Sequence, residues 1–547
     1  MLQGCTEWPA EFAAMYRQKG YWEDITLNQT LEQSVQKYGG DEAIIDGDKR
    51  YTYRDIHEKI ERLAAHFADI GLKTGQRVVF QLPNSAELAI ALYALLKVGA
   101  IPVMSLSPHR ENEISHFVKH AEAVGYLFPD IYRGFDYRQM ADKIKAESPT
   151  LEHLFVLGEA GPGHISLSAL LETPAPEGID ISGLSMAADD IALMLLSGGT
   201  TALPKLIPRT HNDYVLSCTM SQPLTGLDKR GTLLALLPMA HNYTLSSPGL
   251  LGVLRNGGKV VIAPDVTAET IFPLIEKEKV NVVPAVVPVI VNWLNSDIPE
   301  KHDLSSLMVM SNGGIKLQPA LRKRVEEKFG CRFQEIFGTG EGLLSFTRLD
   351  ASEELRFTSS GMPACPDDEV RVIDDDGNDV PEGELGELIV RGPNTICGYY
   401  NAPEKNEEAF TADGYYRMGD IVRMRGRSIW CEGRLKDLIN RGGEKISCDE
   451  VENLVVTHPK VKSVGLVAMP DEVFGEKACA YVVLLPGKEL DLEELNGFLL
   501  ERKIAKFKLP ERLEVVDEFP LSPAGKILKR DLREDIIRKL ANEAGQS

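Results

Sequence analysis

Apolar runs alternate with amphipathic stretches through the first half of the chain. The run RVVFQL at residues 77–82 predicts a buried strand, residues 86–98 carry apolar side chains at helical spacing, and residues 100–106 predict the next strand. The same alternation returns over residues 230–280. Buried strands that alternate with helices are typical of largely parallel sheets covered by helices. The pattern therefore predicts an α/β fold with two such sheet subdomains.

The pattern changes in the second half of the chain. Residues 369–391 contain short strands separated by the turn formers at 374–377 and 381–383, which predicts a small barrel-like subdomain. After residue 435 a compact piece of about 110 residues begins, a normal size for a domain. We therefore expect a large N-terminal domain over residues 1–435 and a small α+β C-terminal domain over residues 436–547.

Composition and charge narrow the range of partners. Of 547 residues, 43% are hydrophobic and 26% are charged, and 60 basic against 81 acidic residues give a formal net charge of −21. That charge disfavours nucleic acid and anionic membrane surfaces as partners. No apolar run reaches the length of about 18 residues that spans a bilayer, and no secretory signal is seen. We expect small-molecule or protein partners.

The eight cysteines are scattered and contain no C-x-x-C pair. The spacing therefore suggests neither a zinc site nor a disulfide framework, and it fits a reducing compartment. We expect a cytoplasmic protein.

A loop rich in glycine and hydroxyl residues follows a strand-like run at residues 195–205, LLSGGTTALPK. Glycines let backbone N–H groups approach a polyphosphate, hydroxyls donate hydrogen bonds, and a lysine adds a positive charge. The loop does not match the Walker pattern, and such clusters are commonly flexible surface loops. Both interpretations stay open on the residues alone. The candidate phosphate-binding residues are Ser197, Gly198, Gly199, Thr200, Thr201 and Lys205.

Three further motifs each place one charged group beside a turn. Glu341 ends the run Gly338-Thr339-Gly340-Glu341, where its carboxylate can hold Mg²⁺ on phosphates or simply be solvated. Asp420, in YRMGD, can accept hydrogen bonds from two ribose hydroxyls or serve as a turn residue. Lys526, in PLSPAGK, can present a cation to a reacting carboxylate and phosphate or lie on the surface.

Taken together and in this order, the motifs resemble those of the adenylate-forming superfamily of acyl-CoA synthetases, luciferases and nonribosomal-peptide adenylation domains. The resemblance extends from about residue 22 to about residue 533. It implies a ligase that uses ATP and Mg²⁺, in which the loop from Ser197 to Lys205 embraces the β- and γ-phosphates and Gly338 and Thr339 belong to the nucleotide site. The resemblance further implies the roles of four charged residues. Glu341 would coordinate Mg²⁺, Asp420 would bind the ribose, Arg434 would support that contact, and Lys526 would stabilise the adenylation transition state.

The resemblance also implies a two-step cycle. Lys436 falls at the family's hinge, about which a mobile C-terminal domain swings between the half-reactions. That rotation would withdraw Lys526 and bring Gly442 and Gly443 to the incoming thiol arm, since a backbone without Cβ lets a narrow ligand pass. The chain contains no carrier motif. The acceptor would therefore be a separate aryl carrier protein with its phosphopantetheine arm, which the resemblance favours, or free coenzyme A.

The segment LPMAHNYTLSSPG at residues 237–249 is similar to that of stand-alone aryl-acid-AMP ligases of siderophore assembly, above all those for 2,3-dihydroxybenzoate. The similarity implies that Asn242 contacts the acid and its ortho hydroxyl, that His241 lies beside the carboxylate as a catalytic candidate with Lys205 and Lys526, and that Ser247 favours the dihydroxy acid. Helix capping for Asn242 and Ser247, and a satisfied core position for His241, are the structural alternatives. Further acyl-pocket candidates are Gly313, Gly314 and Gly340.

Several positions depart from the subfamily pattern. Thr339-Gly340 replaces Met-Ala, Met418 replaces a threonine, and Asn312 and Ile315 add polarity and bulk. These departures leave salicylate, 3-hydroxypicolinate or a similar acid as alternative substrates.

Two other functions stay open. One is an aryl-CoA ligase, which shares the first step. The other is a nucleotide-binding scaffold without catalysis, which the retention of the four charged candidates at 205, 341, 420 and 526 disfavours.

Overall fold

The structure is a computed structural model that describes residues 2–184, 186–198, 204–227, 230–442, 444–502, 504–522 and 526–544. Backbone contacts divide the chain into two compact units. The first unit consists of Met1–Gly198, Leu203–Val370 and Val390–Tyr416, and the second mainly of Arg371–Ile389 and Arg417–Ser547. The division into two domains at residue 435 stays a prediction. The hinge at Lys436 concerns motion and stays a prediction.

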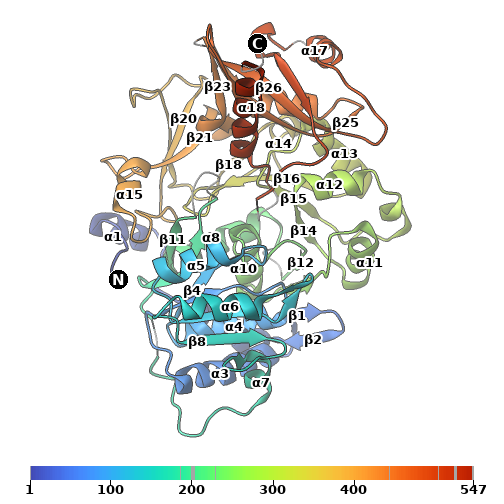
Figure 1. Ribbon diagram of the computed structural model, residues 1–547. Coiled ribbons are helices and arrows are strands. Elements are labelled where there is room, and N and C mark those ends of the chain that lie inside the picture. The colour runs from blue at the N-terminus through green and yellow to red at the C-terminus, as the bar shows by residue number, and fades with distance from the viewer. Residues whose placement is uncertain are drawn as a thin grey trace. The chain divides into compact units, whose positions relative to one another are not determined.

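A seven-stranded sheet forms one layer of the first unit (Figure 1). Its strands run parallel except that β11 pairs antiparallel with β10 at one edge. In spatial order the strands are β11 (Leu206–Thr210), β10 (Ile191–Leu196), β4 (Ile101–Met104), β3 (Arg77–Phe80), β5 (Gly125–Pro129), β8 (His153–Leu157) and β9 (Ile165–Ser166).

Helices pack on this sheet because the side chains of each strand alternate between its two faces. Val79 of β3 joins the apolar core formed with α5 (Glu111–His120) and α6 (Tyr137–Ala146). Helix α4 (Ala86–Lys97), which the sequence predicts over residues 86–98, contacts β4 and α3 (Tyr53–Ile70). The hydroxyl of Ser85 accepts a hydrogen bond from the Leu88 N–H, which explains why α4 begins there.

A nine-stranded sheet forms the second layer of the same unit. Its six central strands are parallel, and antiparallel strands close both edges. In spatial order the strands are β18 (Met362–Pro363), β17 (Leu344–Phe346), β16 (Arg332–Gly338), β15 (Val309–Gly313), β14 (Val282–Ala285), β12 (Thr232–Ala235), β13 (Lys259–Ile262), β1 (Glu42–Asp46) and β2 (Lys49–Thr52).

Trp293 anchors the core on one face of this sheet. The indole is almost fully buried among side chains from α11 (Ala268–Glu278), α12 (Val287–Leu294) and α13 (Pro319–Phe329) and from the sheet strands. The two layers of mixed, mainly parallel sheet confirm the predicted α/β class. The remaining elements of the unit are α1 (Ala10–Gln18), α2 (Leu27–Tyr38), β6 (Ile131–Tyr132), β7 (Phe135–Asp136), α7 (Leu167–Glu172), α8 (His211–Leu224), α9 (Asn242–Leu245), α10 (Leu250–Arg255), η1 (Ile298–Lys301), α14 (Glu353–Thr358) and α15 (Pro403–Ala409).

The second unit, taken by itself, contains a five-stranded sheet with helices on both faces. Helices α16 (Cys448–Val455) and α17 (Leu492–Glu501) share one apolar core with it, and α18 (Lys529–Ala544) covers a second cluster around Tyr481. This is the expected α+β arrangement. The strands are β24 (Glu444–Ser447), β23 (Leu438–Arg441), β26 (Gly475–Leu484) and β25 (Val461–Asp471), with β27 (Arg512–Val515) on β26.

The expected small barrel-like subdomain is a four-stranded sheet. Its spatial order is β19 (Glu369–Ile373), β20 (Gly386–Arg391), β21 (Tyr416–Arg425) and β22 (Ser428–Arg434), with β21 and β22 antiparallel. Two short 3₁₀ turns, η2 (Leu435–Asp437) and η3 (Lys506–Lys508), complete the elements. Within the described ranges no helix is long and apolar enough to cross a bilayer.

Two histidines are buried in the first unit with an acceptor nitrogen in use. Nδ1 of His109 accepts a hydrogen bond from the Leu106 N–H at 3.0 Å, and Nδ1 of His211 accepts one from the Leu27 N–H at 3.2 Å. Burial lowers the pKa of His109 and the pKa of His211 to about 4, because the charged imidazolium loses its hydration. Both rings are therefore neutral at physiological pH.

The free energy of unfolding should fall as the pH drops from 7 to 5. The unfolded chain binds protons on these histidines near pH 6.5, whereas the native state binds them only near pH 4, so acid favours unfolding. The loss should be about 2 kcal/mol per histidine. In urea titrations His109→Asn, whose amide oxygen can replace Nδ1 as acceptor, should be less stable at pH 7 but lose less stability between pH 7 and 5 than the wild type. An unchanged slope in this variant would contradict the assignment.

Candidate active site

Candidate residues of the first unit follow the carboxyl ends of parallel strands. β10 ends immediately before Ser197, β15 ends at Gly313, and β16 ends at Gly338, three residues before Glu341. In α/β sheets the carboxyl ends of the strands form the edge at which ligands bind. The topology therefore places three candidates at the carboxyl edges of the two sheets: the loop that begins at Ser197, the glycine turn from Gly338 to Gly340, and the Glu341 carboxylate.

The base of the glycine-rich loop is closed by Ser197 and Lys205. The Ser197 N–H donates to the Lys205 carbonyl at 3.0 Å, and the Lys205 N–H donates to Ser197 Oγ at 2.9 Å. The Lys205 ammonium lies 3.8 Å from the centroid of the Tyr399 ring. Gly198 is exposed. Three further candidates lie outside the described residues, namely Gly199, Thr200 and Thr201.

Glu341 is buried, and its carboxylate has a defined partner. Its Oε1 accepts a hydrogen bond from the Tyr399 hydroxyl at 2.8 Å, and its carbonyl accepts one from the Ile396 N–H at 2.8 Å. Burial, with the Glu341 charge adding to it, raises the pKa of Tyr399 far above its ordinary value, so the phenol keeps the proton that it donates. Lys205, Tyr399 and Glu341 therefore form one connected group.

This group suits a magnesium ion carried on phosphates. No cluster of three or more His, Cys, Asp or Glu side chains that could hold a metal occurs in the part of the chain that the structure describes. Mg²⁺ usually keeps several waters and binds one or two carboxylates together with substrate phosphates. A single oriented carboxylate at Glu341, beside a lysine, fits that manner of binding and does not fit a cage of protein ligands.

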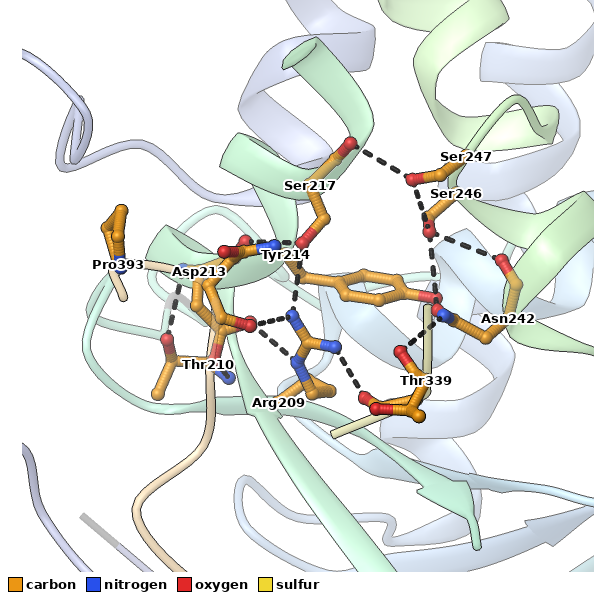
Figure 2. A network of polar contacts seen from close by, with 12 residues as sticks. Arg209, Thr210, Asp213, Tyr214, Ser217, Asn242, Ser246, Ser247, Thr339 and Pro393 are labelled. Carbon is orange, nitrogen blue, oxygen red and sulfur yellow. Dashed lines mark hydrogen bonds and ion pairs between the residues drawn. The ribbon is translucent and has the colours of Figure 1, made fainter. Parts of the chain in front are cut away.

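Asn242 joins three segments of the candidate acyl pocket (Figure 2). Its Oδ1 accepts hydrogen bonds from the Tyr214 hydroxyl at 2.9 Å and from Ser246 Oγ at 3.2 Å, and its Nδ2 donates to the Thr339 carbonyl at 3.5 Å. Residue 241, not Asn242, is the N-cap of α9: Nδ1 of His241 accepts from the Tyr243 N–H at 3.3 Å on an exposed ring. The helix-capping alternative for Asn242 is thus excluded.

Ser247 is fully buried beside α8. Its hydroxyl donates to the Ser217 carbonyl at 3.1 Å and lies 3.0 Å from the hydroxyl oxygen of Ser246 (Figure 2). Helix packing therefore accounts for part of its environment, as one of the two interpretations of the sequence holds.

The glycines of the site differ in what a side chain would meet. A Cβ at Gly338 would lie 2.2 Å from the Leu343 carbonyl oxygen, and one at Gly313 would lie 3.1 Å from the Tyr243 ring. A Cβ at Gly340 would meet only apolar atoms, the nearest at 3.0 Å on Ile207. Gly314 has a φ of +97°, a conformation that favours glycine.

Two further departures from the family pattern, Asn312 and Ile315, lie in different surroundings. Nδ2 of the buried Asn312 donates to Glu335 Oε1 at 2.8 Å and to the Ile315 carbonyl at 2.7 Å. The Asn312 amide nitrogen is therefore directed to Glu335, whereas its buried Oδ1 has no hydrogen-bond partner among the described residues. The Ile315 side chain is 53% exposed, so its extra bulk does not fill a core position.

One charged side chain at this site was missed in the sequence. Arg209, at the end of β11, is buried and donates to Asp213 Oδ1 at 2.9 Å, to the Gly340 carbonyl at 2.6 Å, and to Ser217 Oγ and the Asn394 carbonyl at 3.0 Å each. The available signal was an arginine and an aspartate four residues apart in the segment LIPRTHNDYV. The acceptors 131 and 185 residues away could not be read from that run.

In the second unit, β21 and β22 bring Asp420 opposite Arg434. Arg434 Nε lies 2.8 Å from Asp420 Oδ1, and its Nη1 donates to the Met418 carbonyl at 3.0 Å. The Asp420 side chain is buried. The two candidates thus form an ion pair in which the guanidinium holds the carboxylate in one orientation.

The remaining candidates lie in the C-terminal part of that unit. Lys436 lies in η2, Gly442 has a φ of +60° and donates to the Phe474 carbonyl at 2.8 Å, and Gly443 lies outside the described residues. Lys526 is exposed, and its N–H donates to Ser522 Oγ at 3.1 Å. Leu521 and Ile527 pair as an isolated antiparallel bridge.

Comparison with known proteins relates this geometry to a family. The model of the AMP-binding enzyme family matches residues 31–400, and that of the AMP-binding enzyme C-terminal domain matches residues 450–526. The chain is 45% identical to a 2,3-dihydroxybenzoate-AMP ligase of Bacillus subtilis, over 99% of each chain. It is 41% identical to a salicylyl-CoA synthase / salicylate adenylyltransferase of a Streptomyces species, also over 99% of each.

A solved structure agrees with these matches. The apo structure of MbtA from Mycobacterium smegmatis is 38% identical and superimposes with a TM-score of 0.75, covering 97% of this chain and 98% of that one. The predicted resemblance is confirmed: the chain is an adenylate-forming ligase and belongs to the AMP-binding enzyme family.

Proposed function

We propose that the protein activates a small hydroxylated aryl acid, with 2,3-dihydroxybenzoate as the first choice, by reaction with ATP. The products are the aryl-adenylate and pyrophosphate, and the acyl group then passes to the phosphopantetheine thiol of a separate aryl carrier protein. One observation carries the proposal: within the first unit the candidate acyl pocket at Asn242 is hydrogen-bonded to the glycine turn that precedes Glu341. The 45% identical ligase of Bacillus subtilis supports the choice of acid.

The reaction explains the division of charges. Attack of a carboxylate on the α-phosphate brings two anions together, so catalysis needs cations and positioning more than a nucleophilic side chain. Lys205 supplies one positive charge at the base of the phosphate loop, and Lys526 would supply another at the reacting oxygen. Glu341 would hold Mg²⁺, which when bound neutralises charge on the phosphates. Asp420, oriented by Arg434, would accept hydrogen bonds from the ribose hydroxyls.

The acyl pocket has the polarity that a dihydroxy acid requires. Because Asn242 Oδ1 accepts from Tyr214 and Ser246, its amide nitrogen is oriented away from them and donates one of its two N–H groups to the Thr339 carbonyl at 3.5 Å. That nitrogen can donate to the ortho oxygen of the acid. The Ser247 hydroxyl donates its hydrogen bond to the Ser217 carbonyl, so its oxygen can accept a hydrogen bond from a ring hydroxyl of the acid.

A second candidate keeps the first step and changes the acid and the acceptor. Salicylate as the acid and free coenzyme A as the acceptor are supported by the Streptomyces relative, whose name carries both activities. 3-Hydroxypicolinate is a further candidate acid.

Pyrophosphate exchange against a panel of acids should rank 2,3-dihydroxybenzoate above salicylate, 3-hydroxypicolinate, anthranilate and benzoate. Ser247→Ala should lower kcat/KM for 2,3-dihydroxybenzoate roughly tenfold, because one hydrogen bond is lost, and leave benzoate unchanged. Thr219→Ala, which removes a hydroxyl from the same helix α8, is the matched control and should change neither value. Preference for another acid would reassign the substrate, and silence with every acid would favour the scaffold alternative.

Glu341→Gln should weaken activation by Mg²⁺ and lower kcat roughly 100-fold, because the amide keeps the shape of the side chain but loses the charge that holds the ion. The measurement is the exchange rate as a function of Mg²⁺ concentration at fixed ATP. Glu407→Gln, at an exposed position on α15, is the control with wild-type behaviour. A wild-type Mg²⁺ dependence in Glu341→Gln would remove the carboxylate from the metal site.

Lys526→Ala should lower adenylate formation roughly 100- to 1000-fold and spare transfer to the thiol from a supplied acyl-adenylate, since the lysine would act only in the first half-reaction. Each half-reaction is measured separately, with Lys488→Ala as an exposed lysine control in the same unit. Equal loss of both half-reactions would refute this role.

A further inference from the structure

Arg209 and Asp213 form an ion pair inside the first unit. The residues are 1% and 0% exposed, and Arg209 Nε donates to Asp213 Oδ1 at 2.9 Å. Removing two charges from water is costly unless their remaining donors and acceptors are also satisfied, and apolar side chains of similar volume can fill such a space equally well. What the other hydrogen-bonding groups of the pair contact therefore indicates what the pair does.

On one side the guanidinium holds two backbone segments next to Glu341. Its Nη1 donates to the carbonyl of Gly340, the residue before Glu341, at 2.6 Å. Its Nη2 donates to the carbonyl of Asn394 at 3.0 Å. The second segment also contacts Glu341 directly, because the Ile396 N–H donates to the Glu341 carbonyl at 2.8 Å. The backbone on both sides of the carboxylate is thus fixed by a single planar group.

On the other side the pair fixes the wall of the acyl pocket (Figure 2). Arg209 Nη2 donates to Ser217 Oγ at 3.0 Å, and the carbonyl of the same serine accepts the hydrogen bond from Ser247. The guanidinium carbon lies 5.0 Å from the centroid of the Tyr214 ring, whose hydroxyl donates to Asn242. Asn242 and Ser247, the two polar candidates for acid recognition, are therefore each linked to Arg209 through a single intervening residue.

Asp213 fixes the start of α8, the helix that carries Tyr214 and Ser217. Its Oδ2 accepts from the Thr210 N–H at 3.1 Å, and its own N–H donates to Thr210 Oγ1 at 3.2 Å. This reciprocal capping sets the direction of the first two helical turns, which carry Tyr214 and Ser217.

We propose that Arg209 is a positioning residue that keeps the acid-recognising groups Asn242 and Ser247 in register with the carboxylate Glu341. It does so through hydrogen bonds to Gly340, Ser217 and Asn394, which only the forked guanidinium can make simultaneously. The inference rests on the proposed function. Arg209 sets both acid selectivity and the rate of adenylation, and it contacts neither reacting group.

The test is Arg209→Lys, which retains the charge beside Asp213 but not the fork. In pyrophosphate exchange, kcat/KM for 2,3-dihydroxybenzoate should fall roughly 100-fold, because Asn242, Ser247 and Glu341 are no longer held in fixed positions relative to one another. The ratio of kcat/KM between this acid and benzoate should also fall, and the Mg²⁺ concentration for half-activation should rise several-fold. A lysine that merely filled the core would leave the selectivity ratio and the Mg²⁺ dependence unchanged.

Arg356→Lys is the matched control. Arg356 is likewise buried in the first unit, and its guanidinium pairs with Glu326 at 3.2 Å. This variant should lower the thermal midpoint, as Arg209→Lys does, and leave selectivity and Mg²⁺ dependence at wild-type values. If the two variants behave alike in all three measurements, Arg209 is only a structural residue and the inference is wrong.

Ser217→Ala keeps the test decisive if Arg209→Lys does not fold. It removes one acceptor of the guanidinium and leaves the buried ion pair intact. The selectivity ratio should again fall, and an unchanged ratio would overturn the inference. The wild type is assayed first: if it is inactive with every acid, the proposed function fails, whereas an active wild type with unselective effects in the variants contradicts only the role of Arg209.

Discussion

A buried ion pair between the end of β11 and the first turn of α8 is the constraint on which the first unit's site depends. Arg209 and Asp213 are tolerated without water because each makes further hydrogen bonds in addition to the contact between them. Those bonds end on the glycine turn before Glu341, on the capped start of α8 and on Ser217. The buried ion pair thereby fixes the position of the glycine turn before Glu341 relative to the start of α8.

The fold distributes the chemistry according to the same logic. In the first unit, the carboxyl ends of parallel strands lead into the candidate phosphate loop and into the glycine turn before Glu341, and the candidate acyl pocket is formed by side chains on α8, on α9 and directly after α9. The second unit contains Asp420, oriented by Arg434, and the exposed Lys526. In the proposed cycle the residues that recognise the acid remain on a rigid sheet scaffold, while the cation needed only for adenylation is on the smaller, mobile unit.

Local patterns predicted the elements well, because burial imposes periods of two and 3.6 on the sequence. The helix expected over residues 86–98 is α4 (Ala86–Lys97), and the α+β character of the C-terminal piece was also correct. Contacts between distant segments could not be predicted in this way. The sequence showed that Asn312 adds a polar group, but not that its amide nitrogen donates to Glu335 on the neighbouring strand. Arg209 was not recognised, since its partners lie in segments that adjoin only after the sheets have formed.

The central claim is that this scaffold joins an aryl carboxylate to AMP. The most direct measurement is a single-turnover reaction of the protein with ATP, Mg²⁺ and 2,3-dihydroxybenzoate in the absence of any thiol, quenched and analysed by mass spectrometry. The account predicts up to one equivalent of enzyme-bound aryl-adenylate with an equal amount of pyrophosphate. Formation of ADP and phosphate, or of AMP that never passes through an aryl-adenylate, would contradict it.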